Sequence, residues 1–304
     1  MMRLRRRYVV PEKRNSLLAR ILVVIFAAFF TIPLIWCLSV SLRSTEHMSA
    51  HPEQMLPSSL LLREEWPDFL RARNYTEAWY AFTDIPGKEN LTFSIFFRNT
   101  ALITVFSVVG TVTTASLVAF AFARLRFKGR TVLFTIMLST MFLPAQVTMM
   151  TTFMLWDKLH LIDTWGPLII PAFFGGGAFN IFLLRQFFLT IPKALDEAAL
   201  IDGCSYIGIY RHIIMPLSVP AIVTISLFSF MGQWNNLMGP LIYLNTMSKY
   251  TASIALKLFS DQYGRADVPH LMAASMINTI PMLVLFFIGQ RYFIKGVQLS
   301  GLKE

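Results

Sequence analysis

Six apolar segments constrain this sequence more than any other feature. Each is long enough for an α-helix to cross the hydrocarbon core of a bilayer, which takes about 20 residues. None contains Asp, Glu, Lys or Arg. They lie at residues 21–42, 99–123, between 130 and 157, between 163 and 185, from about 216 to 244, and between 267 and 291. With 55% hydrophobic and only 14% charged residues, the chain has too much apolar surface for a water-soluble core. It is predicted to be an all-α polytopic membrane protein with six transmembrane helices.

The first apolar segment, residues 21–42, is interpreted as a retained membrane anchor. It is too long for the apolar region of a signal peptide and lacks a small-residue cleavage site. The two cysteines, Cys37 and Cys204, fall at different predicted depths, so no disulfide is expected. Prolines inside the segments are expected to kink the helices without ending them. They are Pro33, Pro144, Pro171 and Pro281.

Basic residues flank the apolar segments asymmetrically. If the N-terminus is cytoplasmic, the loops left inside hold 17 of the 27 Lys and Arg residues but only 5 of the 17 Asp and Glu residues. Those inside segments are 1–20, 124–130, 185–211 and 291–304. Because short cytoplasmic loops carry an excess of positive charge, the sequence predicts that both termini are cytoplasmic (N-in, C-in).

This topology also sets the predicted domain organisation. A basic cytoplasmic N-terminus, residues 1–20, precedes a six-helix transmembrane domain, residues 21–304, and an outer cap spans about 43–97. The basic residues lie along membrane boundaries instead of lining one face. Membrane lipid is therefore the expected surrounding, and no nucleic-acid partner is expected.

The stretch at about 190–215 interrupts the apolar pattern with charged residues. Each would cost about 2.5–3.5 kcal/mol at the bilayer centre, so the stretch is predicted to lie outside the hydrocarbon, on the cytoplasmic side. Pro192 suits the first turn of a helix, and Gly203 suits the left-handed residue that ends one. A second short helix is expected from Ser205 to about Ile214. The stretch is thus predicted to form a cytoplasmic helix-turn-helix.

The same stretch resembles the signature loop of permease subunits of ATP-binding-cassette (ABC) importers. That loop has the pattern E-A-A, three residues, G, nine residues, I, one residue, L-P. Met215 stands where the family has leucine. Two further stretches, QWNNLMGPLIYL at 233–244 and RYFIKGVQLSGLK at 291–303, resemble the maltose-type (MalG-like) carbohydrate permeases of the binding-protein-dependent transport family. The matching loop residues are Glu197, Ala198, Ala199, Gly203, Ile213 and Pro216.

The resemblance implies a type I ABC importer permease and a set of partners. It implies a second homologous permease, two ATPase subunits that hold ATP and Mg²⁺, an extracytoplasmic sugar-binding protein and a sugar substrate. The chain itself has no G-x-x-x-x-G-K-[ST] phosphate loop, so no cofactor is expected on it. The loop would dock on an ATPase subunit; the alternative is an amphipathic helix that rests on lipid headgroups. The residues assigned to ATPase coupling are Glu197, Ala198, Ala199, Asp202, Gly203, Ile213 and Pro216.

Uncharged polar residues inside the spans are candidates for a substrate path. Gln233, Trp234, Asn235 and Asn236 lie in the fifth segment, and Asn180 follows a glycine run in the fourth. Amides beside an aromatic ring can bind sugar and line a polar path. They can equally hydrogen-bond neighbouring helices, and the sequence leaves both interpretations open.

The sequence lacks the residue motifs that would indicate an enzyme. No H-E-x-x-H or G-x-S-x-G motif is present, the five histidines are scattered, and neither a catalytic nor a metal site is predicted. The predicted function is a permease subunit that moves a sugar or oligosaccharide by alternating access. The alternative is an ion- or proton-coupled secondary transporter, or a polytopic membrane enzyme. A coupled transporter needs titratable groups in its spans, and His270 is the main one here.

Overall fold

The structure, a computed structural model, describes residues 14–51, 70–83, 90–262 and 267–300, and every regular element in these ranges is helical. Part of the predicted basic N-terminus (1–13), parts of the outer cap (52–69 and 84–89) and the end of the C-terminal motif (301–304) lie outside the described residues. Within the described residues, four helical stretches are long and apolar enough to cross a membrane, and two bent helix pairs raise the number to as many as six. The four are Leu17–Ser41, Phe93–Arg124, Gly166–Thr190 and Val268–Arg291.

The chain divides into two compact units. The first comprises the described residues up to Ala78 together with residues 267–276. Its helices are α1 (Arg14–Ser41), α2 (Thr45–Ala50), most of α4 (Arg73–Tyr80) and the beginning of α16 (Val268–Ser300). The most apolar part of α1 is not buried at all within the structure, as expected of a helix whose surroundings are lipid or another chain.

Polar side chains of the outer cap organise this first unit. The buried Asn74 donates through Nδ2 to the carbonyl oxygens of Ser41 (2.9 Å) and Arg43 (2.6 Å) at the end of α1. Glu77 lies 2.7 Å from Arg73 and 2.9 Å from Nε2 of His270. His270, the titratable residue expected in the sixth span, is therefore held among ion-pair partners at the start of α16.

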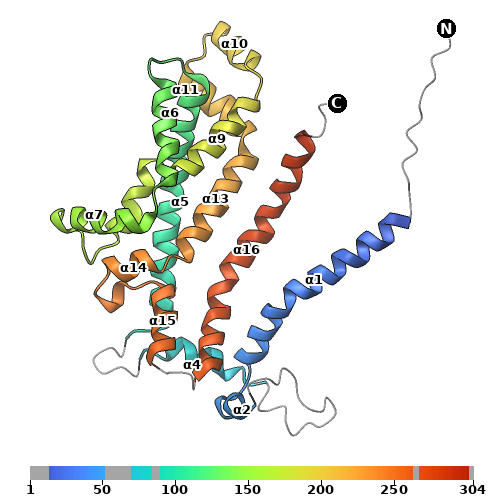
Figure 1. Cartoon of the computed structure of the whole chain (residues 1–304), viewed down its shortest axis with the longest axis vertical. Helices are drawn as coiled ribbons and strands as arrows, with labels where there is room; N and C mark the ends of the chain where they lie inside the picture. Colours follow the sequence, from blue (N-terminus) through green and yellow to red (C-terminus); the bar gives the residue numbers. More distant parts are fainter. Residues whose placement is uncertain (1–13, 52–69, 84–89, 263–266, 301–304) are drawn as a thin grey trace. The chain divides into compact units, whose positions relative to one another are not determined.

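The second unit is built around α5 (Phe93–Arg124). Helices α9 (Ala178–Thr190) and α13 (Val219–Trp234) pack along it, as Figure 1 shows. Small residues on α5 allow this close approach, and their burial with larger residues of the neighbouring helices forms what we call the core cluster. Its buried members are Ala115, Ala119, Phe120, Ala123, Ile181, Leu184, Phe188, Ile191, Ile209, Ile214, Ala221 and Ile225.

The third apolar segment is sharply bent. Helix α6 (Arg130–Ser139) and the 3-10 turn η2 (Thr140–Phe142) are followed by α7 (Ala145–Lys158), and the two arms meet at 103°. The bend falls at Leu143 and Pro144, because proline lacks the N–H that would continue the helix and forces the preceding residue into extended backbone. The proline predicted to kink this segment thus divides it.

The fifth segment also differs from the expected continuous span at about 216–244. Its helix α13 ends at Trp234, and a separate short helix, α14 (Met238–Tyr243), follows. Ahead of it, the helical stretch Tyr206–Leu217 meets α13 at 79°. The remaining elements of this unit are α8 (Gly166–Ile169), η3 (Ile170–Phe174), α10 (Ala194–Ile201), α11 (Tyr206–Ile209), η4 (Tyr210–Ile214), α12 (Met215–Leu217), η5 (Met247–Lys249) and α15 (Ala252–Gln262).

Candidate functional site

Three consecutive glycines break the fourth apolar segment between η3 and α9. Gly175, Gly176 and Gly177 have φ angles of +97°, +58° and +98°, a region that L side chains rarely adopt. A Cβ atom at Gly176 would also collide with the side chain of Thr111 on α5. The run therefore lets an unwound stretch of backbone approach α5 closely, the kind of break that marks binding sites in transporter helices.

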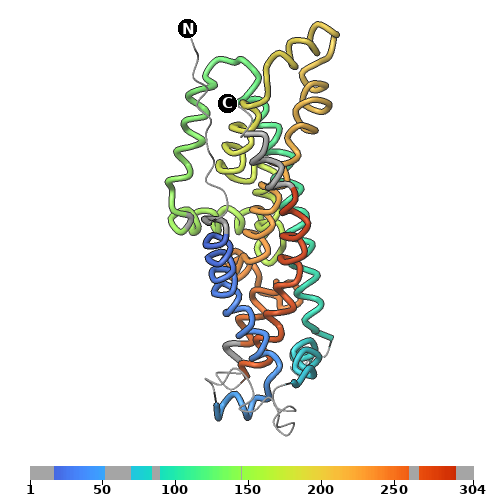
Figure 2. Tube along the Cα trace, turned by 90° about the vertical axis from the view of Figure 1, so that its right-hand side faces the viewer, coloured from blue at the N-terminus to red at the C-terminus, as the bar shows by residue number. Residues whose placement is uncertain are grey.

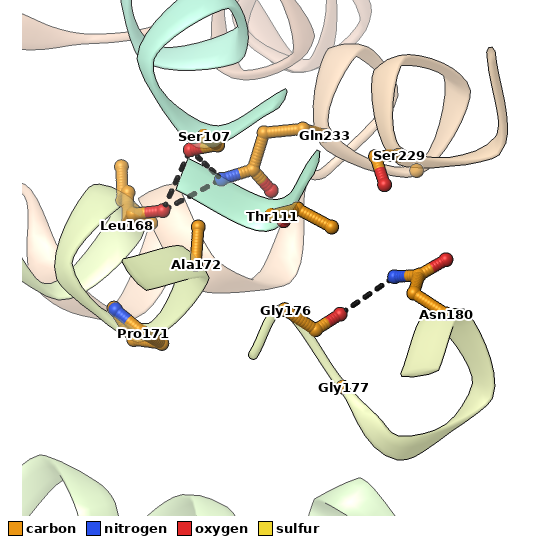
Figure 3. A pocket seen from close by; sticks show the side chains of 11 residues that line it. Ser107, Thr111, Leu168, Pro171, Ala172, Gly176, Gly177, Asn180, Ser229 and Gln233 are labelled. Carbon is orange, nitrogen blue, oxygen red and sulfur yellow. Dashed lines mark hydrogen bonds between the residues drawn. The ribbon is translucent and has the colours of Figure 1, made fainter. Parts of the chain in front are cut away.

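A polar cavity of about 310 Å³ lies beside this break. Figure 3 shows side chains from α5, η3, α9 and α13 converging on it from separate parts of the sequence. None of its 11 lining residues is charged or a histidine. They are Ser107, Thr111, Leu168, Pro171, Ala172, Gly176, Gly177, Asn180, Ser229, Gly232 and Gln233.

Gln233 of α13 is held in place at one side of the polar cavity. Its Nε2 donates to Ser107 Oγ (3.1 Å) and to the carbonyl oxygen of Leu168 (2.7 Å), and its Oε1 accepts a long hydrogen bond from Asn236 Nδ2 (3.4 Å). These contacts join α13 to α5 and α8. The first two are visible as dashed lines in Figure 3.

Two other groups offer hydrogen bonds to a ligand. Asn180 donates through Nδ2 to the carbonyl oxygen of Gly176 (2.7 Å), and its Oδ1 has no partner among the described residues. The buried hydroxyl of Ser229 likewise has none within the described part of the chain. A buried polar group without a partner costs about 1–3 kcal/mol, so a ligand that pairs with it recovers that cost. The chemistry suits an uncharged, hydroxyl-rich ligand.

The structure separates the residues predicted for the substrate path. Asn180 and Gln233 line the polar cavity. Trp234 is only 2% exposed, stacks on Phe230 and donates through Nε1 to the carbonyl oxygen of Asn278 (3.0 Å). Trp234 therefore follows the alternative interpretation from the sequence, in which these side chains hydrogen-bond neighbouring helices.

Asn235 and Asn236 also bond to nearby protein groups. Asn235 donates to the Met231 carbonyl oxygen (3.0 Å), and Asn236 accepts from the Gly239 N–H (3.1 Å). Neither these two nor Trp234 is among the residues that line the polar cavity.

Sequence reasoning missed the hydroxyl groups of the cavity. Ser107 and Thr111 lie four residues apart, so they share one face of α5, and Ser229 lies one turn before Gln233 on α13. The available signal was this helical spacing of small polar residues inside apolar segments.

The stretch predicted as a helix-turn-helix forms α10, a glycine turn and α11. Gly203 has a φ of +80°. The N–H of Cys204 bonds to the Ala199 carbonyl oxygen (2.8 Å), and the N–H of Gly203 bonds to the Leu200 carbonyl oxygen (3.1 Å). This pair of hydrogen bonds is the Schellman motif that ends helices at a left-handed glycine. The second helix, expected from Ser205 to about Ile214, is helical from Tyr206 to Leu217, with a π-helical turn, η4, at Tyr210–Ile214.

The second half of this element is anchored in the helix bundle. Ile209 and Ile214 are buried members of the core cluster, and Ile213 packs against it. Tyr210 lies with its hydroxyl 2.8 Å from Ser116 Oγ on α5. The tip of the element, by contrast, is exposed: Ile201 is 87% exposed and Ile207 is 78% exposed.

The remaining residues assigned to coupling lie on the surface. Glu197, Ala198, Asp202 and Pro216 are exposed, whereas Ala199 is half-buried against the core cluster. An exposed smooth helix face beside an exposed apolar tip can receive a partner chain.

The first half of the element is tied to α5 by an ion pair. Arg124 Nε lies 3.1 Å from Asp196 Oδ2, and Arg124 Nη2 donates to the Ile191 carbonyl oxygen (2.8 Å). Burial raises the pKa of the Asp196 carboxyl above its ordinary value, against the opposing charge of Arg124. The pair therefore fixes α10 to the end of α5 through a largely buried contact.

Long apolar helices around an uncharged polar cavity define a polytopic helical membrane protein. The chain belongs to the family described as binding-protein-dependent transport system inner membrane component, whose sequence model matches residues 111–299. It is thus an inner-membrane component of an ABC transporter, a permease, and the family resemblance drawn from the sequence is confirmed.

Known relatives agree with this membership. The chain is 34% identical over 208 residues to the arabinooligosaccharides transport system permease protein AraQ of Halalkalibacterium halodurans, covering 68% of this chain and 74% of the relative. It is 29% identical to the trehalose/maltose transport system permease protein MalG of Thermococcus litoralis, covering 95% and 99%.

A solved structure shares the fold. It is a chain of a bacterial ABC transporter involved in the import of the acidic polysaccharide alginate, with a TM-score of 0.72 and 24% identity, covering 94% of this chain and 99% of that one.

Proposed function

We propose that this chain is the permease subunit of an ATP-driven importer of an uncharged sugar or oligosaccharide. The observation that carries the proposal is the polar cavity, whose lining offers neutral amide and hydroxyl groups beside a broken helix. The names of the relatives AraQ and MalG, which refer to saccharide transport, support this substrate class. None of the described residues that line the cavity is titratable, so nothing there favours an ion- or proton-coupled transporter.

The proposed assembly contains further subunits. A second homologous permease would complete the transmembrane part, and two separate ATPase subunits would bind ATP and Mg²⁺. The absence of a phosphate loop from the 304 residues supports separate ATPases. An extracytoplasmic sugar-binding protein would deliver the substrate, which the family's description as binding-protein-dependent supports.

In this proposal α10 and α11 face the cytoplasm and contact an ATPase subunit, with both chain termini on the same side. The exposed apolar tip, formed by Ile201 and Ile207, supports a protein contact there. A second support is that the residues matching the family loop are exposed: Glu197, Ala198 and Gly203. Glu197 offers a carboxylate to a basic partner residue.

The link between this element and the cavity supports alternating access. The core cluster joins Ile209 and Ile214 to α5, α9 and α13, and the same three helices line the polar cavity. A displacement of α10 and α11 by closing ATPases would therefore move the cavity walls as a packed body.

Uptake by reconstituted transporter tests the cavity. Asn180→Ala removes an amide from the lining, whereas Asn235→Ala makes the same change on a residue that does not line it. We expect Asn180→Ala to lower uptake of labelled neutral oligosaccharides by about 10-fold, the effect of losing one hydrogen bond to the substrate, and Asn235→Ala to lower it far less. Equal uptake by the two variants would exclude this cavity as the substrate site.

A further inference from the structure

A second cavity, of about 580 Å³, lies at the loop that joins α5 to α6. We call it the basic cavity, because four of the described residues that line it are cationic and none of them is acidic. Figure 2 shows this loop, in green, at the same end of the unit as α10 and α11. The four cationic residues are Arg124, Arg126, Arg130 and Lys193.

Arg124 is the buried member of this set. Its side chain is only 2% exposed, and although Nε and Nη2 contact Asp196 and the Ile191 carbonyl, Nη1 has no hydrogen-bond partner among the described residues. A buried guanidinium N–H group that lacks a partner is costly and indicates an acceptor that the chain itself does not supply.

The charge around the cavity is only partly balanced. Asp196 is the carboxylate that pairs with Arg124, and Lys193 also acts on it. Arg130 donates through Nη1 to the Leu125 carbonyl oxygen (3.1 Å), which leaves its charge in place. Arg126 is exposed and makes no ion pair within the described residues. Four cationic side chains line the cavity, and the carboxylates beside them are Asp196 and its neighbour Glu197, so positive charge is in excess.

The first turn of α6 adds to this potential. The helix begins at Arg130 after Gly129, has no side-chain cap and carries no acidic residue in its first turn. The N–H of Arg130 bonds to the Phe127 carbonyl oxygen (3.4 Å), so the N–H groups of Thr131 and Val132 are the ones that this turn offers to an anion, as at helix N-termini that bind phosphate. Beside them, Val132 and Leu133 are 62% and 51% exposed, which provides apolar surface suited to acyl chains.

We propose that the basic cavity binds a phosphate group, carried by an anionic lipid headgroup or by a soluble phosphate anion. Several guanidinium groups around one cavity match the geometry and charge of phosphate oxygens. If the cavity faces the cytoplasmic leaflet, anionic lipid is the abundant source of such groups. A bound phosphate would share Arg124 with Asp196, and through this pair it would act on the position of α10.

The test uses the full-length chain and two sources of phosphate. One arm titrates inorganic phosphate into the detergent-purified chain at constant ionic strength and measures binding by calorimetry. The other reconstitutes the chain in phosphatidylcholine nanodiscs with or without phosphatidylglycerol and measures retained phosphatidylglycerol by native mass spectrometry. Both arms compare wild type with Arg126→Gln, with the double variant Arg126→Gln and Arg130→Gln, and with Lys128→Gln. Lys128 lies in the same loop but does not line the cavity.

We expect the double variant to weaken binding by about 10-fold or more, Arg126→Gln to weaken it by a smaller factor, and Lys128→Gln to leave it nearly unchanged. If the variants weaken binding in this order only in the nanodisc arm, the ligand is a lipid headgroup. If they do so only in the phosphate arm, the ligand is a soluble anion. Absence of binding by wild type in both arms overturns the proposal. Equal weakening of binding by Lys128→Gln and by Arg126→Gln also overturns it. Arg126 is exposed and its replacement removes no contact within the described structure, so this single variant is a fair comparison.

Discussion

Arg124, the last residue of α5, forms a largely buried ion pair with Asp196 of α10, with 3.1 Å between Nε and Oδ2. Only 2% of the Arg124 side chain and 14% of the Asp196 side chain are exposed. The contact joins a helix that lines the polar cavity to the element proposed to meet the ATPase. It is a second attachment of that element, beside the burial of Ile209 and Ile214 in the core cluster.

Removing one partner of this pair should destabilise the chain. Asp196→Ala leaves the Arg124 guanidinium buried without a counter-charge, which costs about 3 kcal/mol. Asp202→Ala, in the same element but exposed, is the matched control and should have little effect. Thermal unfolding of the detergent-purified variants measures both. Replacing both partners by Met and Leu should recover part of the loss, and a double variant less stable than Asp196→Ala would contradict this account.

The turn between α10 and α11 requires a left-handed residue at position 203. Nothing lies within 4 Å of a Cβ placed on Gly203, so a substitution there acts through backbone strain and not through a clash. Gly203→Val should lower the free energy of unfolding by about 1–2 kcal/mol and misdirect α10. Gly203→Asn should have a smaller effect, because asparagine tolerates this conformation.

In the reconstituted transporter, Gly203→Val should lower sugar-stimulated ATP hydrolysis and uptake together while the chain remains inserted. Ala199→Trp, which adds bulk next to the turn, should do the same. Wild-type ATPase activity and uptake in both variants would remove these residues from the coupling role.

The glycine run that borders the polar cavity should tolerate substitution unequally. Gly176→Ala adds a Cβ that collides with Thr111, in addition to the strain of a positive φ. Gly177, at φ 98° and ψ 145°, is also in a backbone region that favours glycine, but a Cβ there meets nothing within 4 Å. We expect Gly177→Ala to lower the free energy of unfolding by backbone strain alone, about 1–3 kcal/mol, and Gly176→Ala to lower it further through the clash with Thr111. Folded yield by fluorescence-detected size exclusion would compare them, and equal yields would contradict the close approach to α5.

Asp163 should make stability depend on pH in the acid range. It has a positive φ of 59°, accepts from the N–H groups of Asn245 (2.9 Å) and Thr246 (2.8 Å), and lies 2.8 Å from the Lys249 Nζ. The Lys249 ammonium, together with the Thr246 hydroxyl, holds the pKa of the Asp163 carboxyl far below its usual value.

A lowered pKa in the folded state means that this stabilisation is complete above the ordinary aspartate pKa of about 3.9 and is lost as the pH falls below it. Asp163→Asn keeps the tolerance for positive φ but removes the charge. Its unfolding temperature should therefore lie below that of wild type at neutral pH and approach it below about pH 4. Asp157→Asn, an exposed carboxylate nearby, is the control, and a constant gap at all pH values would contradict the assignment.

The N-in, C-in topology can be tested with single cysteines. The loop that joins α5 and α6 should be cytoplasmic and the residues after α1 should be outside, as the distribution of basic residues predicts. A cysteine at the exposed Ser49 should react with a membrane-impermeant thiol reagent in intact spheroplasts, and one at Lys128 should react only after permeabilisation. Cys37 and Cys204 are first replaced by serine. Equal labelling at Ser49 and Lys128 would reject the topology.

The membrane helices and the turn at Gly203 could be predicted from the sequence because each depends on residues that are close together in the chain. Long runs without charge indicate membrane helices whatever surrounds them, and a glycine between two helical stretches indicates a left-handed turn, which Gly203 adopts. The expected uninterrupted fifth span at about 216–244 did not account for the break after Trp234, where α13 ends before α14 begins. Hydropathy does not register such a break because the residues on both sides remain apolar.

The sequence by itself determined that this chain is a helical membrane permease of a known family, because apolar length and the spaced residues of the 197–216 loop are properties of the linear order. Only the tertiary structure decided which polar residues share a cavity. Ser107, Asn180 and Ser229 meet because three helices pack together, whereas Trp234, close to Gln233 in sequence, turns into the packing against Asn278. Neighbours along a helix diverge by about 100° per residue, so their destinations depend on what packs on each face of the helix.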